Sequence, residues 1–381
     1  KKIQKDNIKG FTFLGYMELR DPLRAAAKDQ ILAAKRAGVR TVIITGDHPE
    51  TARAIGAEAG LQAGPDSVVI GSELDKWSDD ELEKRVSRIA VYARVEPRHK
   101  IRIVKAWQAR DEVVAMTGDG VNDAPALKAA DIGIAVGFGT DVAKQASDVV
   151  ILDNDLGTIS AAIEEGRVIF DNIRKVSVYL IAGSFTEVFL IGSAMVMGLT
   201  APLLAVQILW INFFADSFPH LGLALEKKEL DVMRMRPRKR SEHVLNADMI
   251  KMIAIIAIVA NIFLLALFFW LLGTDRSVEA VRSMMFVAVG VDSLFFVFSA
   301  RTFRKSIFRM NPFSNGWLLG GVAIGFIMMI AATTIPFLKM VFEVTPLSLS
   351  DWSLLLMIAL IKVIIIELAK ETFILRKQAK A

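Results

Sequence analysis

Oxygen-bearing side chains are concentrated in one short run of the chain, from Met116 to Lys128. Asp119, Asn122 and Asp123 lie within five positions of one another there, after a short apolar stretch of the kind that forms a buried strand. Glycines on both sides of Asp119 let the backbone turn tightly, and a proline follows where a helix can begin. Mg²⁺ that also holds a phosphoryl group needs oxygen ligands on such a loop. The run therefore predicts phosphate and metal chemistry, with an ordinary turn between a strand and a helix as the alternative.

Polar side chains also occur inside long apolar segments of the second half. Ser184 and Glu187 are three positions apart, so they share one face of a helix. Asn212 and Asp216, four positions apart, share a face in the same way, and Asp292 is the acid of a later segment. A charged group at mid-membrane costs at least ~2.5 to 3.5 kcal/mol on insertion scales, which makes each a functional candidate. Such oxygen ligands suit a hard cation such as Ca²⁺, and a buried structural polar cluster is the alternative.

The elements that must position the first group alternate between short strands and helices. We predict strands over 39–44, 113–116, 132–136 and 149–152, and helices over 24–37, 49–59 and 97–110. This alternation favours an α/β fold with a doubly wound, Rossmann-like parallel sheet and ligands at the carboxyl ends of its strands. Thr45, Lys100 and Asp119 are expected to converge there.

The second group requires membrane helices. A long helix is predicted to start near Asp155 and to continue into apolar sequence. About 20 apolar residues cross a bilayer, and six segments are long enough: 176–198, 203–225, 249–272, 281–300, 317–338 and 352–373. Lys and Arg gather after the second and fourth segments, so the positive-inside rule predicts that these connections, the first half and the tail are cytoplasmic.

Composition agrees with a membrane protein of two parts. The chain of 381 residues is 53% hydrophobic, too apolar for one soluble domain, yet its 23% of charged residues is too high for a wholly embedded one. The net charge of +5 comes with no aromatic and basic groove, so nucleic acid is not an expected partner. The absence of cysteine excludes disulfides and thiolate metal sites. Because the sequence starts at Lys1 and not at Met, we expect a piece of a longer chain.

The remaining ionisable residues receive ordinary interpretations. The histidines, which are His48, His99, His220 and His243, have no metal-ligand spacing and are interpreted as incidental. In the last apolar segment, which also contains Lys362, we interpret Glu367 and Lys370 as an interfacial pair and not as part of an ion path.

The run from Met116 to Lys128 closely resembles the hinge signature of the P-type cation ATPases, whose phosphorylation domain has a haloacid-dehalogenase-like fold. Three further stretches resemble segments of that family in the expected order: Asp21 to Arg24, Ile44 to Asp47 and Ala93 to Lys100. The resemblance implies phosphoryl transfer from ATP with Mg²⁺.

The same resemblance implies roles for individual residues. Asp119 would ligate Mg²⁺, and Asn122 and Asp123 would order that loop. Lys100 would neutralise phosphoryl charge. The second phosphate-binding loop would contribute the hydroxyl of Thr45, the amide of Gly46 and, as support, Asp47.

Residues 179–187 and 207–216 resemble the ion-binding fifth and sixth membrane helices of the calcium-pump branch. That branch has acids at the positions matched by Glu187, Asp216 and Asp292. Two departures stand out, because Ser184 replaces the usual Asn and Ala215 the usual Thr. The resemblance implies Ca²⁺ as the transported cation and leaves Na⁺, K⁺, H⁺ and Mn²⁺ open.

Several family segments do not occur in this sequence. It contains neither Asp-Lys-Thr-Gly-Thr, whose aspartate accepts the γ-phosphate, nor the Thr-Gly-Glu-Ser loop. We expect the carboxyl-terminal part of a plasma-membrane pump, which is inactive alone and is completed by an amino-terminal part. In this prediction, residues 1–154 belong to the phosphorylation domain, 155–175 form a stalk helix, 176–373 form six membrane helices and 374–381 form a cytoplasmic tail. A phosphatase with a membrane anchor, or a channel or other non-enzymatic membrane partner, is the alternative.

Overall fold

The computed structural model describes residues 12–15, 17, 23–62, 64–153, 155–229 and 232–375. The chain divides into two compact units. Unit 1 comprises Lys1–Ser160 and Arg236–Arg240, and unit 2 comprises Ala161–Met235 and Ser241–Ala381. Each unit has its own hydrophobic core and is considered by itself. Asp21, in the segment predicted to resemble a family motif, lies outside the described residues.

Unit 1 is an α/β unit, as predicted. Its strands are β1 (Ile43–Ile44), β2 (Val68–Ile70), β3 (Val91–Ala93), β4 (Ala115–Gly118), β5 (Ile132–Val136) and β6 (Val149–Ile151). Its helices are α1 (Ala27–Arg36), α2 (Pro49–Glu58), α3 (Gly71–Leu74), α4 (Asp79–Arg85), α5 (Pro97–Ala109), α6 (Ala124–Ala129) and α7 (Asp141–Ala146). The strands form two three-stranded parallel sheets, ordered β1-β3-β2 and β4-β5-β6. Parallel pairing with helical crossovers confirms the predicted fold class.

The helix α5 packs against both sheets of unit 1. Its Ile103 belongs to the cluster that contains Tyr92 of β3, and its neighbour Val104 belongs to the cluster that contains Met116 of β4. Ile44 of β1 packs against both clusters. The apolar clusters next to β1 and β4, the strands that precede the predicted phosphate loops, therefore meet at Ile44.

His99 of α5 has a structural role that its sequence context did not indicate. It is 2% exposed, its Nδ1 accepts a hydrogen bond from the amide of Glu96, and its Nε2 lies 2.9 Å from a carboxylate oxygen of Asp75. This hydrogen bond, with the charge of Arg98, lowers the pKa of Asp75.

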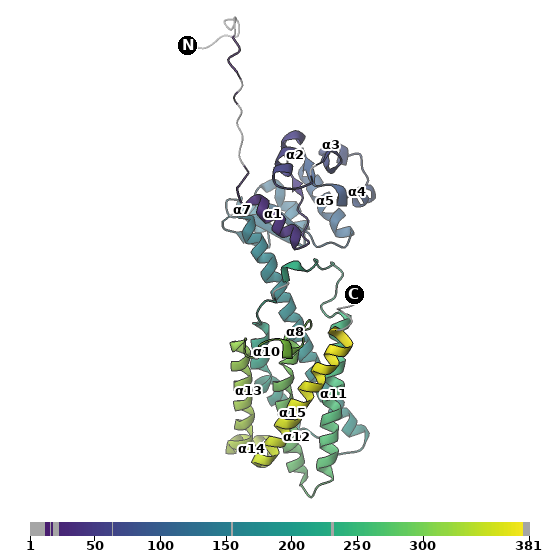
Figure 1. Cartoon of the computed structure of the whole chain (residues 1–381), viewed down its shortest axis with the longest axis vertical. Helices are drawn as coiled ribbons and strands as arrows, with labels where there is room; N and C mark the ends of the chain where they lie inside the picture. The colour runs from purple at the N-terminus through teal and green to yellow at the C-terminus, as the bar shows by residue number, and fades with distance from the viewer. Residues whose placement is uncertain are drawn as a thin grey trace. The chain divides into compact units, whose positions relative to one another are not determined.

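Unit 2 is helical (Figure 1). Its helices are α8 (Leu156–Val196), which begins in unit 1, then α9 (Ala205–Trp210), α10 (Ser217–Ala224), α11 (Ala247–Leu272), α12 (Val278–Phe296), α13 (Gly316–Thr334), α14 (Pro336–Phe342) and α15 (Leu349–Lys370). α8 is a single helix of 41 residues, so the predicted stalk and the first predicted span are continuous.

Five helical stretches in the described residues are long and apolar enough to cross a membrane: 157–196, 247–272, 278–301, 316–334 and 349–375. They correspond to five of the six predicted spans. The second predicted span is instead built of α9, a π-helix over Ile211–Ala215, and α10. A sixth crossing therefore stays a prediction.

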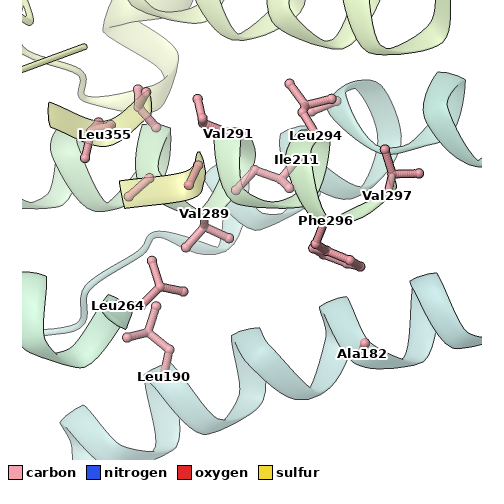
Figure 2. Packing of buried hydrophobic residues seen from close by; sticks show 14 of the residues in the cluster. Ala182, Leu190, Ile211, Leu264, Val289, Val291, Leu294, Phe296, Val297 and Leu355 are labelled. Carbon is pink, nitrogen blue, oxygen red and sulfur yellow. The ribbon is translucent and has the colours of Figure 1, made fainter. Parts of the chain in front are cut away.

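The core of unit 2 lies around α12, where the cluster of buried apolar residues is densest. Figure 2 shows side chains from α8, α11 and α15 gathered about this helix, among them Leu190, Leu264 and Leu355. Every residue of α12 from Ser283 to Leu294 is buried. An acid within that stretch is therefore enclosed by protein.

Candidate functional site

The first candidate site lies on the loop after β4. Asp119 and Asn122 are exposed there, whereas Asp123 is buried at the start of α6. The backbone at Asp119 is held in place because the carbonyl oxygen of Asp119 accepts a hydrogen bond from the amide of Thr140 at 2.8 Å. No side-chain partner of Asp119 occurs among the described residues, so its carboxylate is free to bind a ligand.

The structure brings Lys100 and Asp123 together. The local sequence around either residue did not predict this contact. The Lys100 ammonium, on α5, forms an ion pair with the Asp123 carboxylate. The other oxygen of Asp123 accepts a hydrogen bond from the amide of Gly120 at 3.2 Å. Both side chains are largely buried, at 15% and 10% exposure, so the pair positions Lys100 beside the loop that carries Asp119.

The second phosphate-binding loop follows β1. The Thr45 hydroxyl donates a hydrogen bond to Asp47 at 2.9 Å, and the amide of Asp47 donates one to the Thr45 hydroxyl oxygen at 3.1 Å. Gly46 is exposed between them. The Thr45 amide donates to the carbonyl of Tyr92, which anchors the loop to β3. Direct contact between Thr45 and Asp119 is not part of this arrangement, so their convergence stays a prediction.

A magnesium site has requirements that can be compared with the described residues of unit 1. No group of three or more His, Cys, Asp or Glu side chains suited to a metal lies within the described residues. Mg²⁺ keeps several waters and uses one or two carboxylates plus phosphate oxygens, so the free Asp119 carboxylate fits a site that is completed by other ligands.

The second candidate site lies in unit 2. Asn212 Nδ2 is 3.1 and 3.2 Å from the two carboxylate oxygens of Glu187, which joins α8 to the π-helix. Asp216, directly after the π-helix, is 7% exposed and accepts a hydrogen bond from the Ser293 hydroxyl of α12. π-helical turns are frequent at functional sites, because they interrupt the regular hydrogen bonds of a helix.

Three of the predicted acids line one small cavity. Glu187, Asp216 and Asp292 surround a space of about 10 Å³, enough for roughly one water-sized species. Thr186 and Ser293 add hydroxyl groups to its wall. Carboxylates that face one small cavity form an arrangement that a hard cation would neutralise.

The structure does not bring Ser184 to this cavity. Its side chain is exposed, and its hydroxyl donates to the carbonyl of Leu180 at 3.0 Å, which is the usual bond of a helical serine to the preceding turn. Asn212 is also exposed, so it reaches the cavity only through Glu187.

Asp292 has a partner that the sequence analysis missed. Lys362 of α15 lies 2.5 Å from its carboxylate, and both side chains are almost completely buried. The available signal was a lysine in the middle of an apolar segment. Farther along α15, Glu367 and Lys370 form the predicted pair at 2.6 Å, but both side chains are 0% exposed within unit 2.

Comparison with known families finds matches to both units. The model described as "Cation transporting ATPase, C-terminus" matches residues 200–372. Models of haloacid dehalogenase-like hydrolases match residues 2–131 and 101–163.

Curated relatives are similar over nearly the whole chain. Calcium-transporting ATPase 1 of Bacillus cereus is 39% identical over 377 residues, covering 94% of this chain and 42% of the relative. A calcium-transporting ATPase of Listeria monocytogenes is 38% identical, covering 97% and 42%. A probable cation-transporting ATPase F of Mycobacterium tuberculosis is 38% identical, covering 96% and 41%.

The chain matches the carboxyl-terminal part of P-type cation-transporting ATPases. It spans about two fifths of the length of the curated relatives it matches. Its five candidate spans make it a multi-pass membrane protein.

Proposed function

We propose that this chain is the carboxyl-terminal part of an ATP-driven Ca²⁺ pump of the plasma membrane. The observation that carries the proposal is the meeting of Glu187 and Asp216 at one small cavity, in a chain that also carries the Asp119 loop. Asp292 lines the same cavity, but its carboxylate is paired with Lys362. Carboxylates enclosed by membrane helices are costly unless a cation or protons neutralise them. Ca²⁺ is preferred because it takes several oxygen ligands, and the Bacillus and Listeria relatives are named calcium-transporting ATPases.

In the complete pump, unit 1 would support phosphoryl transfer to an aspartate outside this sequence. Asp119 is the residue that would hold Mg²⁺, and that ion would counter the charge of the phosphoryl group. Lys100, oriented by Asp123, would add a positive charge, and Asn122 would keep the loop in place. The loop after β1 would bind phosphoryl oxygens of the ATP-derived group through Thr45, Gly46 and Asp47.

Phosphorylation tests the first half of the proposal. In the complete pump, Asp119→Asn should lower phosphoenzyme formation from ATP by about 10²-fold or more, since it removes charge from the proposed Mg²⁺ ligand. Asp66→Asn, an exposed acid of the same unit, is the control. Normal phosphoenzyme levels in the Asp119 variant would remove this residue from the mechanism.

Ion dependence tests the second half. Asp216→Asn should raise the Ca²⁺ concentration needed for phosphorylation by at least about tenfold, because a charged ligand is lost. Asp275→Asn, an exposed acid after α11, should leave it unchanged. If the wild type responds to Na⁺, K⁺, H⁺ or Mn²⁺ and ignores Ca²⁺, the ion assignment is wrong. An unchanged Ca²⁺ requirement in Asp216→Asn would show that the site is misplaced.

A further inference from the structure

A larger cavity lies in unit 2 at the ends of two helices, and none of the predicted site residues lines it. Its volume is about 160 Å³. Three segments form its wall: α8 at Lys175, the residues 226–229 that follow α10, and the residues 301–314 that follow α12. We call it the basic pocket.

The lining of the basic pocket is predominantly positive. Its cations outnumber its carboxylates by five to two: Lys175, Lys227, Lys228, Arg301 and Lys305 against Glu226 and Glu229. Lys228 is already paired with Glu164 at 2.9 Å. The remaining like charges that face the cavity repel one another, so an anion bound among them would lower the electrostatic energy.

One ion pair within the wall is already satisfied. Arg301, whose side chain is 0% exposed, binds both carboxylate oxygens of Glu226 at 2.7 and 3.0 Å. Its remaining donors reach Ser314 and the carbonyl of Pro312. This ion pair forms a rigid part of the pocket wall. Because its two charges neutralise each other, it offers no net charge to a ligand.

The Lys175 ammonium, in contrast, keeps unused donors. Its side chain is 4% exposed, and it has three N–H groups. It donates one hydrogen bond, to Asn172 at 3.2 Å, and the nearest Glu229 oxygen is 3.9 Å away, beyond hydrogen-bonding distance. The other oxygen of Glu229 is buried and lies 3.9 Å from the guanidinium of Arg304, and it accepts no hydrogen bond within the described part of the chain. A ligand with both acceptor oxygens and a hydroxyl donor would satisfy both groups.

Two further lysines stand at the mouth of the pocket. Lys227 and Lys305 are exposed, and neither side chain has an acidic partner among the residues that the structure describes. They come from different loops, after α10 and after α12. Both loops are on the side that the positive-inside rule assigns to the cytoplasm.

We propose that the basic pocket binds a hydroxyl-bearing phosphate anion, with phosphate oxygens against Lys175, Lys227 and Lys305 and a hydroxyl directed to Glu229. Two sources offer this chemistry. One is the head group of an anionic phospholipid such as phosphatidylglycerol, and the other is free hydrogen phosphate.

Native mass spectrometry of the full 381-residue chain in neutral detergent tests the proposal. Short-chain phosphatidylglycerol, short-chain phosphatidylcholine and inorganic phosphate are titrated separately. We expect one saturable phosphatidylglycerol or phosphate adduct, and weaker binding of the zwitterionic lipid. In the double variant Lys227→Ala with Lys305→Ala, affinity for the anion should fall by at least about tenfold. Lys251→Ala with Lys339→Ala removes the same charge elsewhere in unit 2 and should leave the affinity unchanged.

The two sources give different results. Saturation by phosphatidylglycerol that inorganic phosphate does not displace identifies a lipid site, whereas displacement at millimolar phosphate identifies a free-anion site. Because Lys227 and Lys305 are exposed, their removal does not disturb the core. Equal anion affinity of the wild type and the mouth variant, or equal binding of phosphatidylcholine and phosphatidylglycerol, would overturn the proposal.

Discussion

The two carboxylates of the loop after β4 differ in their surroundings. Asp123 is buried against Lys100, whereas Asp119 projects without a side-chain partner in the described residues. The short loop thus contains one acid that holds the loop in place and one acid that is available to a ligand. Gly118 makes this possible, because its missing side chain leaves room for Asp123.

Substitution of Gly118 tests that arrangement. A Cβ atom at this position would lie 2.5 Å from the Cβ of Asp123, so Gly118→Ala must displace Asp123 from Lys100. We expect a loss of about 1 to 3 kcal/mol in unfolding free energy from overpacking, and phosphoenzyme formation in the complete pump lowered by at least about tenfold. Gly120→Ala is the control, since its Cβ would meet Asp123 at an ordinary 3.5 Å. Equal behaviour of the two variants would contradict this account.

Lys362 and Asp292 form a second pair whose partners depend on each other. Lys362→Met should destabilise the chain by about 3 to 5 kcal/mol, because a buried carboxylate loses its counter-charge. Adding Asp292→Leu should restore most of that loss, since the double variant buries no unpaired charge. Thermal unfolding in detergent measures the stability of both variants. Additive destabilisation in the double variant would show that the two side chains do not act as a pair.

Residues that act together could be predicted from the sequence where they are close together in the chain, and not where they are far apart. Asp119, Asn122 and Asp123 share one run, so their motif could be read directly. Lys362 is separated from Asp292 by about seventy residues, and no local pattern indicates that α15 places one beside the other. Asp292 was therefore predicted as a free ligand when its carboxylate already has a cation.

Among the elements, α10 and α13 approach each other closely through glycine. A Cβ atom at Gly321 would lie 2.4 Å from the carbonyl oxygen of Phe218, and one at Gly325 would lie 2.8 Å from that of Ala215. Glycines four residues apart allow such backbone contact between membrane helices. This contact holds the helical segment that carries Asp216 against α13.

Gly321→Ala should therefore destabilise unit 2, by about 1 to 3 kcal/mol, because the backbones must move apart. Gly320→Ala is a matched control that should stabilise unit 2. Its Cβ meets nothing within 4 Å, and alanine favours a helix over glycine by up to about 1 kcal/mol. Unfolding midpoints of the purified chain compare the two. A midpoint for Gly321→Ala at or above that of the wild type would refute the close packing.

The elements themselves could be predicted to different degrees. α2, α5 and β5 lie where periodicity and capping residues indicated. β2 and β3 were not predicted, since each has only three residues and takes its strand character from pairing with a neighbour and not from its own sequence. The π-helix was also missed, because a hydropathy pattern does not distinguish it from an α-helix.

For the molecule as a whole, the open question is how many times the chain crosses the membrane. Five helices meet the length and hydropathy expected of a span, and the segment formed by α9, the π-helix and α10 is the sixth candidate. Residues 205–224 at ~1.5 Å per residue extend about 30 Å, the thickness of the hydrocarbon core. By the positive-inside rule, the lysines and arginines after α10 predict that the following connection is cytoplasmic.

Single cysteines in this cysteine-free chain decide between five and six crossings. His243→Cys lies after α10 and Asp275→Cys after α11, and both positions are exposed. If α9 to α10 crosses the membrane, an impermeant thiol reagent added outside intact cells labels Asp275→Cys and not His243→Cys. If that segment does not cross, α8 leaves the next connection outside and the labelling reverses. Permeabilised cells, in which both cysteines should react, are the control. Because Asp216 lies within this segment, the reversed pattern would also remove it from any path across the membrane.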